Sequence, residues 1–303
     1  MSNPALGQDF SADALPLCQP PDPDPRMPLL HCPPGTTDCH VHVYGPESKY
    51  QVANTRSFDV PEALPATLRR LADTLGVERA VLVQPSGYGT DNSRHLDAAD
   101  ELGIPTRVIV ALRADIPESD LRQLHHRGVR GVRYNIGHAG AVPIEEMPLL
   151  ARKIAPLGWH VQLHVMDDGG QAPLAQMEEA LMGLPTDIVI DHIGSIRPER
   201  GVAQPGFQTL LRLVGTGRCW VKLSCGYRMS HEPPPYLDML PYVQALVASR
   251  PDRLVWASDW PHVSFKGRMP NTTDLLDLMT TWVPDESTRN RIFVDNPTEL
   301  YQF

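Results

Sequence analysis

TTDCHVHVY at residues 36–44 is followed by PEALPATLRRLADTLG at 61–76, RAVLVQPS at 79–86 and DNSRHLDAADELG at 91–103. The first and third of these segments are short and rich in β-branched residues, whereas the second and fourth are longer and amphipathic. Short apolar runs are typical of buried strands, and apolar residues three or four positions apart are typical of helices. The sequence therefore predicts two strand–helix units in succession.

The same alternation continues along the chain. Strand-like and helix-like segments follow in turn at 107–113 (RVIVALR), 117–128 (PESDLRQLHHRG), 131–136 (GVRYNI), 143–158 (PIEEMPLLARKIAPLG), 160–165 (HVQLHV), 173–185 (PLAQMEEALMGLP), 187–194 (DIVIDHIG), 207–217 (FQTLLRLVGTG), 219–225 (CWVKLSC), 236–251 (YLDMLPYVQALVASRP) and 254–262 (LVWASDWPH). Eight strands result, and the first lacks the glycine-rich GxGxxG turn that a doubly wound sheet would usually show. We therefore predict one α/β domain, a (β/α)₈ TIM barrel.

Two segments lie outside this alternation. Residues 1–35 are rich in proline and polar residues and show no periodicity, which predicts an N-terminal arm, packed over the domain or partly disordered, ahead of a barrel at 36–303. The tail, residues 273–303, predicts one or two extra C-terminal helices. Asn296 and Pro297 mark the expected start of a helix there.

The composition excludes several classes of protein. The net charge of −9 and the absence of a Lys/Arg-rich run argue against a nucleic-acid or anionic-membrane partner. No apolar run approaches the roughly 20 residues that span a bilayer, and no secretory signal is visible, so a cytoplasmic location is expected. Five cysteines without CxxC spacing argue against a disulfide framework and a thiolate zinc site.

Polar residues follow the predicted strands where a barrel forms its active site, at the C-terminal ends. Strand one ends with His40 and His42, which point to the same side because side chains alternate along a strand. Strand five carries His164, strand six ends at His192 and strand eight ends at Asp259. An HxH pair alone is a weak signal and a lone aspartate often caps a helix, but four converging strand ends predict a catalytic site. Other histidines are expected to be solvated, namely His31, His95, His125 and His126.

Eight segments that are specific in combination support a family assignment. They are DCHVHVYGP (38–46), VLVQPSGYGTDN (81–92), GVRGVRYN (128–135), GWHV (158–161), VIDHIG (189–194), WVKLSC (220–225), WASDWPH (256–262) and DNPTELY (295–301). With them the chain resembles the amidohydrolase superfamily, in the branch of 2-pyrone-4,6-dicarboxylate lactonase, 4-sulfomuconolactone hydrolase and sugar-lactone hydrolases. The resemblance implies that Asp259 accepts a proton from the hydrolytic water, beside His40, His42 and His192.

The resemblance also implies which residues contact the substrate. The contacts implied by the resemblance are Ser86, Arg133 and Arg228, and we expect His262 to line the same pocket. Two arginines of the dicarboxylate lactonase are replaced, by Ser195 and by Ala139. Loss of bidentate arginine–carboxylate pairs weakens the binding of a dianion, so the resemblance favours an anionic lactone in general over that dicarboxylate.

A third departure concerns metal. In the family that the chain resembles, the dicarboxylate lactonase looks metal-independent and has a tyrosine on strand five. This chain has His164 there, at the position where mononuclear zinc lyases of the superfamily place a metal ligand. His40, His42, His164 and Asp259 would suit one divalent ion, zinc or manganese, with an open position for water. No lysine stands on strand four for a binuclear site. A metal-free site, with His164 as a hydrogen-bonded pocket residue, stays open.

The predicted function is hydrolysis of a small anionic lactone with Asp259 as general base. His192, with His40 and His42 or their metal, would polarise the carbonyl. A metal-dependent decarboxylase or hydratase of an unsaturated or aromatic acid, and a lactone isomerase, are the alternatives. A non-catalytic binding barrel is hard to reconcile with an aspartate beside converging histidines. By analogy with other barrels, a homo-oligomer is possible.

Overall fold

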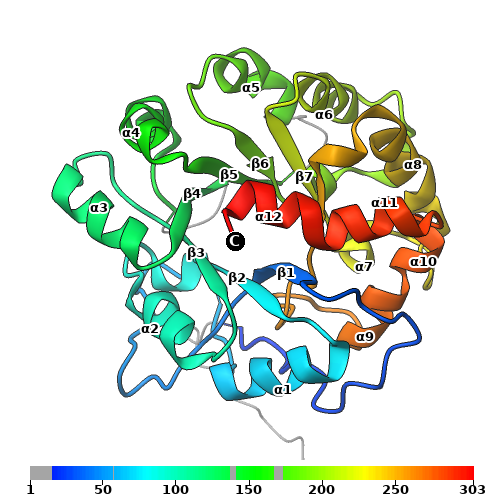
Figure 1. The fold of residues 1–303 in the computed structure, drawn as a ribbon, viewed down its shortest axis with the longest axis horizontal. Helices are drawn as coiled ribbons and strands as arrows, with labels where there is room; N and C mark the ends of the chain where they lie inside the picture. The colour runs from blue at the N-terminus through cyan, green and yellow to red at the C-terminus, as the bar shows by residue number, and fades with distance from the viewer. Residues whose placement is uncertain (1–15, 57, 137–140, 167–172) are drawn as a thin grey trace, which may run out of the picture.

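Eight parallel strands form a single sheet in sequence order, in a computed structural model that describes residues 16–56, 58–136, 141–166 and 173–303. The strands are β1 (Thr37–Val41), β2 (Arg79–Val83), β3 (Thr106–Val110), β4 (Val129–Ile136), β5 (His160–Val165), β6 (Ile188–Ile190), β7 (Cys219–Leu223) and β8 (Leu254–Trp256). Helices surround the strands on the outside (Figure 1). The predicted (β/α)₈ barrel is confirmed.

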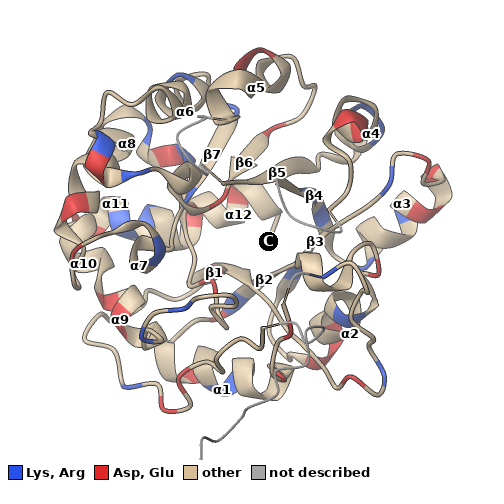
Figure 2. Cartoon of the chain, turned by 180° about the vertical axis from the view of Figure 1, so that it is seen from behind, with Lys and Arg blue, Asp and Glu red and all other residues tan. Residues whose placement is uncertain are grey.

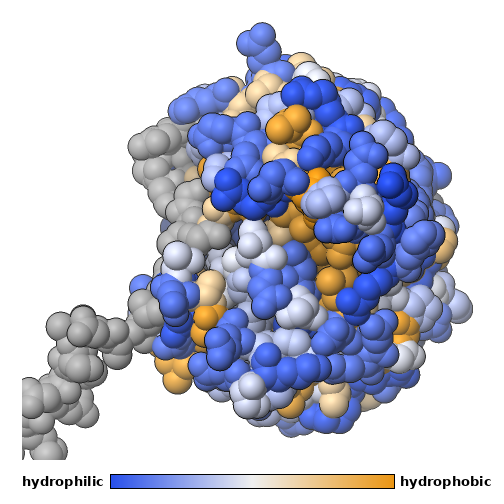
Figure 3. Space-filling model, turned by 90° about the vertical axis from the view of Figure 1, so that its left-hand side faces the viewer, coloured by the Kyte–Doolittle hydropathy of each residue, from blue (hydrophilic) through white to orange (hydrophobic). Residues whose placement is uncertain are grey.

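The helices separate successive strands and cover the barrel. They are α1 (Pro65–Leu75), α2 (Ser93–Glu101), α3 (Glu118–His126), α4 (Met147–Ile154), α5 (Pro173–Met182), α6 (Pro205–Gly215), α7 (Gly226–Met229), α8 (Leu240–Ser249), α9 (Thr272–Asp277), α10 (Met279–Trp282), α11 (Glu286–Asn290) and α12 (Asn296–Tyr301). In α1, Leu68, Leu71 and Leu75 recur at helical spacing and are buried. Charged residues lie mainly on the surrounding helices and loops (Figure 2), and the face shown in Figure 3 is largely hydrophilic.

The barrel closes where the chain leaves β8 and passes beside β1. The His42 amide donates to the Trp260 carbonyl at 2.8 Å, and the Asp259 amide donates to the His40 carbonyl at 3.0 Å. A parallel bridge joins Val41 to Trp260. These contacts bring the segment after the last strand against the first strand, so Asp259 lies beside the two strand-one histidines.

An extra residue in β1 shapes the interior of the barrel. Asp38 pairs with Ala80 and Val41 pairs with Leu82, so the strand bulges between them. Cys39 packs in the apolar cluster inside the barrel, and the next residue, His40, also faces inward, where its ring lies against the buried Asp191. The bulge therefore adds His40 to the inward-facing side chains without displacing the apolar core.

Helix α12 closes the end of the barrel where the strands begin. Asn296 Nδ2 donates to the carbonyl of Leu254, the first residue of β8, at 2.6 Å. Leu300 and Tyr301 belong to the apolar cluster inside the barrel. Figure 1 shows α12 lying across the barrel centre. The opposite end, where the strands finish, is left for the polar residues.

The C-terminal tail forms four short helices, α9 to α12, instead of the expected one or two. Local capping explains the difference. Asn271 and Asp285 accept backbone N–H groups at the starts of α9 and α11, and Pro284 follows the end of α10. The two caps start two helical stretches, 272–282 and 286–301, which are divided further at Leu278 and by a π-helical turn at Arg291–Asp295.

Residues 16–35 of the N-terminal arm pack against this tail. The Asp277 carboxylate accepts the backbone N–H groups of Leu29 and Leu30, and Asn271 Nδ2 donates to Asp22 and to the Asp24 carbonyl. The division of arm and barrel at residue 35 stays a prediction. In the described ranges, no helix combines the length and the apolar character needed to cross a membrane.

Candidate active site

Three neighbouring strands are each followed by a residue in the left-handed region of backbone space. His192 after β6 has φ 52°, Cys225 after β7 has φ 61° and Asp259 after β8 has φ 64°. Such a conformation costs a non-glycine residue about 1 to 3 kcal/mol and tends to occur at functional sites. Here the sharp turns direct the three side chains into one buried cluster at the mouth of the barrel.

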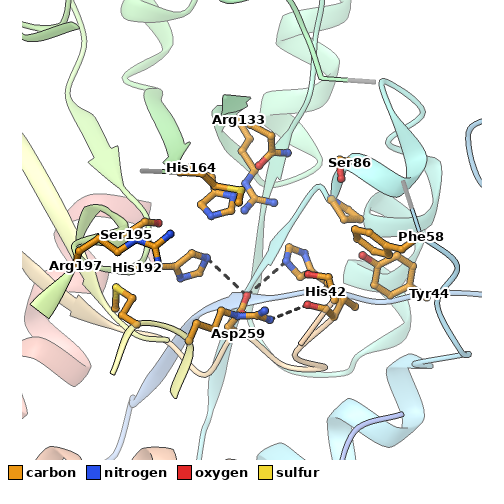
Figure 4. Close-up of a pocket in the computed structure, with 17 residues that line it drawn as sticks. His42, Tyr44, Phe58, Ser86, Arg133, His164, His192, Ser195, Arg197 and Asp259 are labelled. Carbon is orange, nitrogen blue, oxygen red and sulfur yellow. Dashed lines mark hydrogen bonds and ion pairs between the residues drawn. The ribbon is translucent and has the colours of Figure 1, made fainter. Parts of the chain in front are cut away.

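The centre of this cluster is one carboxylate oxygen that faces three imidazoles, of which those of His42 and His192 are drawn in Figure 4. Asp259 Oδ1 lies 3.8 Å from the Nε2 atoms of His40, His42 and His192. The Nε2 atoms of His40 and His42 are 3.2 Å apart. All four residues are buried. Four of the residues predicted from the strand ends therefore come together.

The second oxygen of Asp259 is held by two residues of α7 and by the residue just before that helix. Oδ2 accepts hydrogen bonds from Tyr227 Oη at 2.9 Å, from Cys225 Sγ at 3.1 Å and from Arg228 Nη2 at 3.1 Å. Arg228 also donates to the Val263 carbonyl. The carboxylate is therefore fixed on one side while its other oxygen faces the histidines. No sequence pattern had indicated Tyr227 or Cys225 as site residues.

Hydrogen bonds on the far side of two rings orient the imidazoles. His42 Nδ1 lies 2.6 Å from the Val83 carbonyl oxygen and His192 Nδ1 lies 2.8 Å from Ser224 Oγ. A carbonyl can only accept, so His42 carries its proton on Nδ1 and has an unprotonated Nε2. Metal-binding histidines are oriented in this manner.

Behind the histidines lies a buried ionic group centred on Asp191. Its Oδ2 accepts from Arg133 Nη2 at 3.2 Å and from Gln162 Nε2 at 3.1 Å. Its Oδ1 is 3.2 Å from His40 Nδ1 and 3.3 Å from Lys222 Nζ. Neither Asp191 nor Lys222 was predicted as a site residue. Their signal was a charged residue inside or directly after an apolar strand.

A pocket of about 220 Å³ opens above Asp259. Ser86, Arg133 and Arg228 line it, as expected for substrate contacts. The other lining residues are His42, Tyr44, Phe58, Pro85, Asn135, His164, Met166, His192, Ser195, Arg197, Met229, Val263 and Ser264. Tyr44 and Phe58 stand on one side, across Asp259 from Ser195 and Arg197 (Figure 4). The pocket thus combines an aromatic wall with cationic groups.

Two predicted site residues lie apart from this centre. His164 lines the pocket, and its ring centroid lies 5.1 Å from that of His192. Among the described residues, however, it is not part of any group of three or more side chains whose ligand atoms lie close enough together to share a metal ion. His262 is fully buried, and its ring nitrogens bond with Tyr227 Oη and Thr272 Oγ1. Their roles as metal ligand and substrate contact stay predictions. Ala139 lies outside the described residues.

His95 was expected in solvent, and this prediction is wrong. Its side chain is buried on the inner face of α2, and Nε2 accepts the Val43 amide at 3.4 Å. The amphipathic pattern of α2 turns His95, with Leu96 and Ala98, toward the barrel. The adjacent ring of His42 is 6.4 Å away, between centroids.

The residues at the centre fit a divalent cation. His40, His42 and Asp259 offer ligand atoms that all lie within 4.8 Å of one another. In a tetrahedral zinc site, ligand atoms lie roughly 3.3 to 3.6 Å apart, given bonds of about 2.0 to 2.2 Å. The observed 3.2 and 3.8 Å separations bracket that range. His192 Nε2 lies at the same distance from Asp259 Oδ1 and is a candidate fourth ligand, although His192 forms a separate group with Asp259 and Cys225.

The amidohydrolase family model matches residues 37–303. The chain belongs to the amidohydrolase family. The resemblance identified from the eight sequence segments is confirmed.

Individual relatives of this amidohydrolase are similar over most of their length. A 4-sulfomuconolactone hydrolase from Hydrogenophaga intermedia is 36% identical over 274 residues, which cover 89% of each chain. A 2-pyrone-4,6-dicarboxylate hydrolase from Comamonas testosteroni is 33% identical over 92% of this chain and 93% of its own. The structure of a probable 2-pyrone-4,6-dicarboxylic acid hydrolase from Acinetobacter baumannii, with citric acid bound, matches with a TM-score of 0.77 and 28% identity, over 89% of this chain and 100% of its own.

The surroundings of Asp259 keep this carboxyl group of the amidohydrolase ionised. Burial would raise its pKa, but neighbouring His192, Arg228 and the strand-one histidines hold the pKa well below its usual value. Burial also lowers the pKa of His192 itself, so at neutral pH the charged partner is Arg228. Asp259 therefore stands as a carboxylate beside one guanidinium and three neutral imidazoles.

Buried histidines predict that this amidohydrolase loses stability in acid. Burial lowers the pKa of His42 and of His160 to about 3, and that of His262 to about 4, from 6.5. Between pH 6.5 and these lowered pKa values, the unfolded chain binds more protons than the folded chain. The contribution of the neutral histidines to folding stability is therefore fully present above pH 6.5 and is lost as the pH falls. We expect the free energy of unfolding to fall between pH 6.5 and 4, by up to about 1.4 kcal/mol per pH unit for each histidine.

Denaturant unfolding at pH 7, 6, 5 and 4 measures this effect. His160 lies at the barrel end away from the pocket, where its ring packs against Tyr301. His160→Leu should therefore reduce the pH slope, whereas His126→Leu, at an exposed position of α3, should leave it unchanged. A free energy of unfolding that stays constant over this range would contradict the neutral, buried state of these histidines.

Proposed function

We propose that this amidohydrolase opens a small lactone that carries an anionic group. The observation that supports it best is the Asp259 carboxyl group, paired with Arg228 at the base of a pocket that Arg133 and Arg228 line. The two relatives are hydrolases of 4-sulfomuconolactone and of 2-pyrone-4,6-dicarboxylate, and the Acinetobacter protein holds citric acid, a polycarboxylate. A lactone with one anionic group contains the ester bond that is hydrolysed and a negative charge that can pair with the two arginines.

In this proposal Asp259 is the general base for the attacking water. General-base catalysis contributes roughly 10²- to 10⁴-fold, most when the pKa of the base is near the working pH. Arg228 holds Asp259 as a carboxylate, and its side chain, 25% exposed, also lines the pocket. An anionic substrate group that draws Arg228 toward itself would weaken the Arg228–Asp259 pair and raise the pKa of Asp259. Substrate binding would thereby strengthen the base.

His192 is the donor that we assign to the lactone carbonyl. Its Nδ1 contacts Ser224 Oγ, a hydroxyl that can donate, so its Nε2 can carry a proton that faces the pocket. His42 cannot supply such a donor, because its proton is engaged by the Val83 carbonyl. A hydrogen bond from His192 would stabilise the oxyanion that forms during water attack.

We further propose one divalent ion, zinc or manganese, in the group of His40, His42 and Asp259. The fourth ligand that the sequence predicts is His164, which leaves His192 Nε2 to donate to the carbonyl; if His192 were the ligand instead, its Nε2 would bind the ion and could not be that donor. When bound, such an ion would supply Lewis acidity and lower the pKa of a water molecule. The protein residues keep their separate tasks, in which Asp259 accepts the proton and the arginines hold the substrate anion.

Acid release from a panel of lactones tests the proposed function. The panel contains unsaturated lactones with a carboxylate or sulfonate, their neutral esters or amides, and saturated sugar lactones. We expect ring opening with consumption of water and release of one acid group per turnover, fastest on the anionic members. Carbon dioxide release would instead indicate a decarboxylase, and rearranged lactone without acid release would indicate an isomerase.

Arg228→Met should raise KM for anionic lactones by about 10- to 150-fold. This corresponds to losing a charge-assisted hydrogen bond worth roughly 1.5 to 3 kcal/mol. Arg133→Met should act in the same direction, with an added loss of stability because its guanidinium also pairs with the buried Asp191. Steady-state kinetics on matched charged and neutral lactones measure both effects. The control is Arg152→Met, at an exposed position of α4.

A uniform loss on both kinds of lactone would contradict the role of the arginines in anion binding. It would assign Arg133 and Arg228 to support of the barrel, through Asp191 and Asp259. The other expectations from the sequence remain proposals. They are a cytoplasmic location, a possible homo-oligomer and a small molecule as partner in place of nucleic acid or membrane.

A further inference from the structure

Lys222 is a fully buried lysine in β7, directly behind the strand-one histidines. Its Nζ lies 3.2 Å from His40 Nδ1 and 3.3 Å from Asp191 Oδ1. An ammonium group removed from water is costly unless nearby groups compensate it. The proposed hydrolysis gives Lys222 no contact with substrate, since it does not line the pocket as described. Its position indicates that it acts on His40.

The donors and acceptors around His40 determine where its proton lies. A lysine ammonium only donates, so the hydrogen bond from Lys222 requires an unprotonated Nδ1 on His40 and leaves the proton on Nε2. His42 has an unprotonated Nε2, because its Nδ1 donates to the Val83 carbonyl. The 3.2 Å contact between the two Nε2 atoms is then a hydrogen bond from His40 to His42.

These contacts form a chain of hydrogen bonds with one direction, from Lys222 through His40 and His42 to the Val83 carbonyl. Each ring nitrogen of His40 and His42 thereby has a partner of the matching kind, donor to acceptor. Asp191 Oδ1 forms ion-pair contacts with His40 Nδ1 at 3.2 Å and with Lys222 Nζ at 3.3 Å, but at His40 Nδ1 the contact that has the angles of a hydrogen bond is the one with Lys222. The geometry therefore favours Lys222 over Asp191 as the partner of His40 Nδ1.

A metal ion requires the opposite proton position. To bind through Nε2, His40 must carry its proton on Nδ1, which would then donate to the Asp191 carboxylate, an arrangement common behind metal-binding histidines. Without an ion between them, two unprotonated Nε2 atoms 3.2 Å apart would repel each other. Asp191 therefore supports the metal-bound tautomer and Lys222 supports the metal-free one.

We propose that Lys222 is a positioning residue that keeps the proton of His40 on Nε2, joins His40 to His42 by a hydrogen bond and thereby weakens divalent-cation binding at the site. The inference rests on the proposed cation group of His40, His42 and Asp259, but it needs no particular substrate. Asp191 is the opposing partner, ready to take the Nδ1 proton when a cation enters.

Lys222→Met tests the inference, because methionine keeps the unbranched shape without the ammonium. Asp191 would retain Arg133 and Gln162 on Oδ2, and its Oδ1 would be left to accept from His40. We expect the Zn²⁺ affinity of the metal-free protein, measured by calorimetric titration, to rise about 10- to 100-fold, the usual effect of groups behind metal-binding histidines. Lys153→Met is the matched control, since Lys153 donates only to the carbonyls of Ala114 and Ile116.

Nitrogen-15 NMR of histidine-labelled protein provides a second readout that is independent of catalysis. Two-bond proton–nitrogen correlations distinguish the two tautomers, and a His40→Gln spectrum assigns the signals. We expect His40 to be protonated on Nε2 in the metal-free native protein, and on Nδ1 after Zn²⁺ saturation and in metal-free Lys222→Met. This measurement on the native protein remains decisive if Lys222→Met does not fold.

Two results would overturn the inference. One is protonation of His40 on Nδ1 in the metal-free native protein, and the other is unchanged or weaker Zn²⁺ binding by folded Lys222→Met. Neither depends on turnover, so failure of the proposed lactone hydrolysis would be seen separately in the assays on the lactone panel.

Discussion

Asp259→Asn is expected to lower kcat by at least about 10³-fold, within the range that general-base catalysis contributes. An amide cannot accept the proton of the attacking water. It also cannot pair electrostatically with Arg228, the charged neighbour that holds the carboxylate in place. The loss should appear in kcat on every lactone that the native protein opens, because the base acts on water and not on a particular substrate group.

The fold should survive this substitution. The Asn oxygen can take the Oδ2 position and accept from Tyr227 and Arg228, while the amide NH₂ replaces Oδ1. There it would lie among the three neutral imidazoles, in the position of an oxygen that is 3.8 Å from each Nε2. Arg228 keeps its hydrogen bond to the Val263 carbonyl. We therefore expect a melting temperature within about 4 °C of the native value, roughly 1 to 2 kcal/mol in a chain of this size.

Steady-state assays beside thermal melts by circular dichroism check both parts of the prediction. Asp238→Asn is a matched control, because this aspartate lies away from the pocket and bonds to Ser230 and the His231 amide. Asp259→Asn with near-native kcat and a native melting temperature would show that another group is the base. Loss of activity together with unfolding would instead assign Asp259 to structural support.

The strand order and much of the centre could be predicted from sequence because they depend on local patterns. Short β-branched runs indicated the strands, and strand ends in a barrel share one face, so His192 and Asp259 could be assigned to the same site before any contact was known. Side-chain alternation also placed His40 and His42 on one side. The bulge in β1, which turns Cys39 inward as well, has no comparable sequence signal.

The groups behind the histidines could not be predicted because their roles depend on long-range packing. Lys222 is one charged residue in the strand CWVKL, and only the closed barrel places it against His40, 182 positions away in sequence. His95 has the same limitation, because a histidine on an amphipathic helix can face either water or the sheet. The sequence indicates which strand a residue belongs to. The side chain that it contacts on the other side of the barrel is determined only when the strands close into the barrel.

Protein purified without chelator is expected to contain about one divalent ion per chain, zinc or manganese, and to lose activity when the ion is removed. His42→Gln should abolish ion retention, because His42 has an unprotonated Nε2 directed at Asp259 in the group with His40. Chelation should lower kcat by about 100-fold or more, equivalent to roughly 2.7 kcal/mol of barrier. Re-addition of the same ion should restore it.

His164→Tyr separates the ligand set that the sequence predicts from the set that the geometry favours. If His164 binds the ion, tyrosine at this position lowers occupancy, because a phenol is a poor ligand at neutral pH. If His192 is the fourth donor instead, occupancy is retained and only the pocket wall changes. Elemental analysis of each variant, with the exposed-site variant His231→Gln as control, decides between them. Full activity in metal-free protein would contradict both sets and leave Asp259 to act with His192 and the hydrogen-bonded pair of His40 and His42.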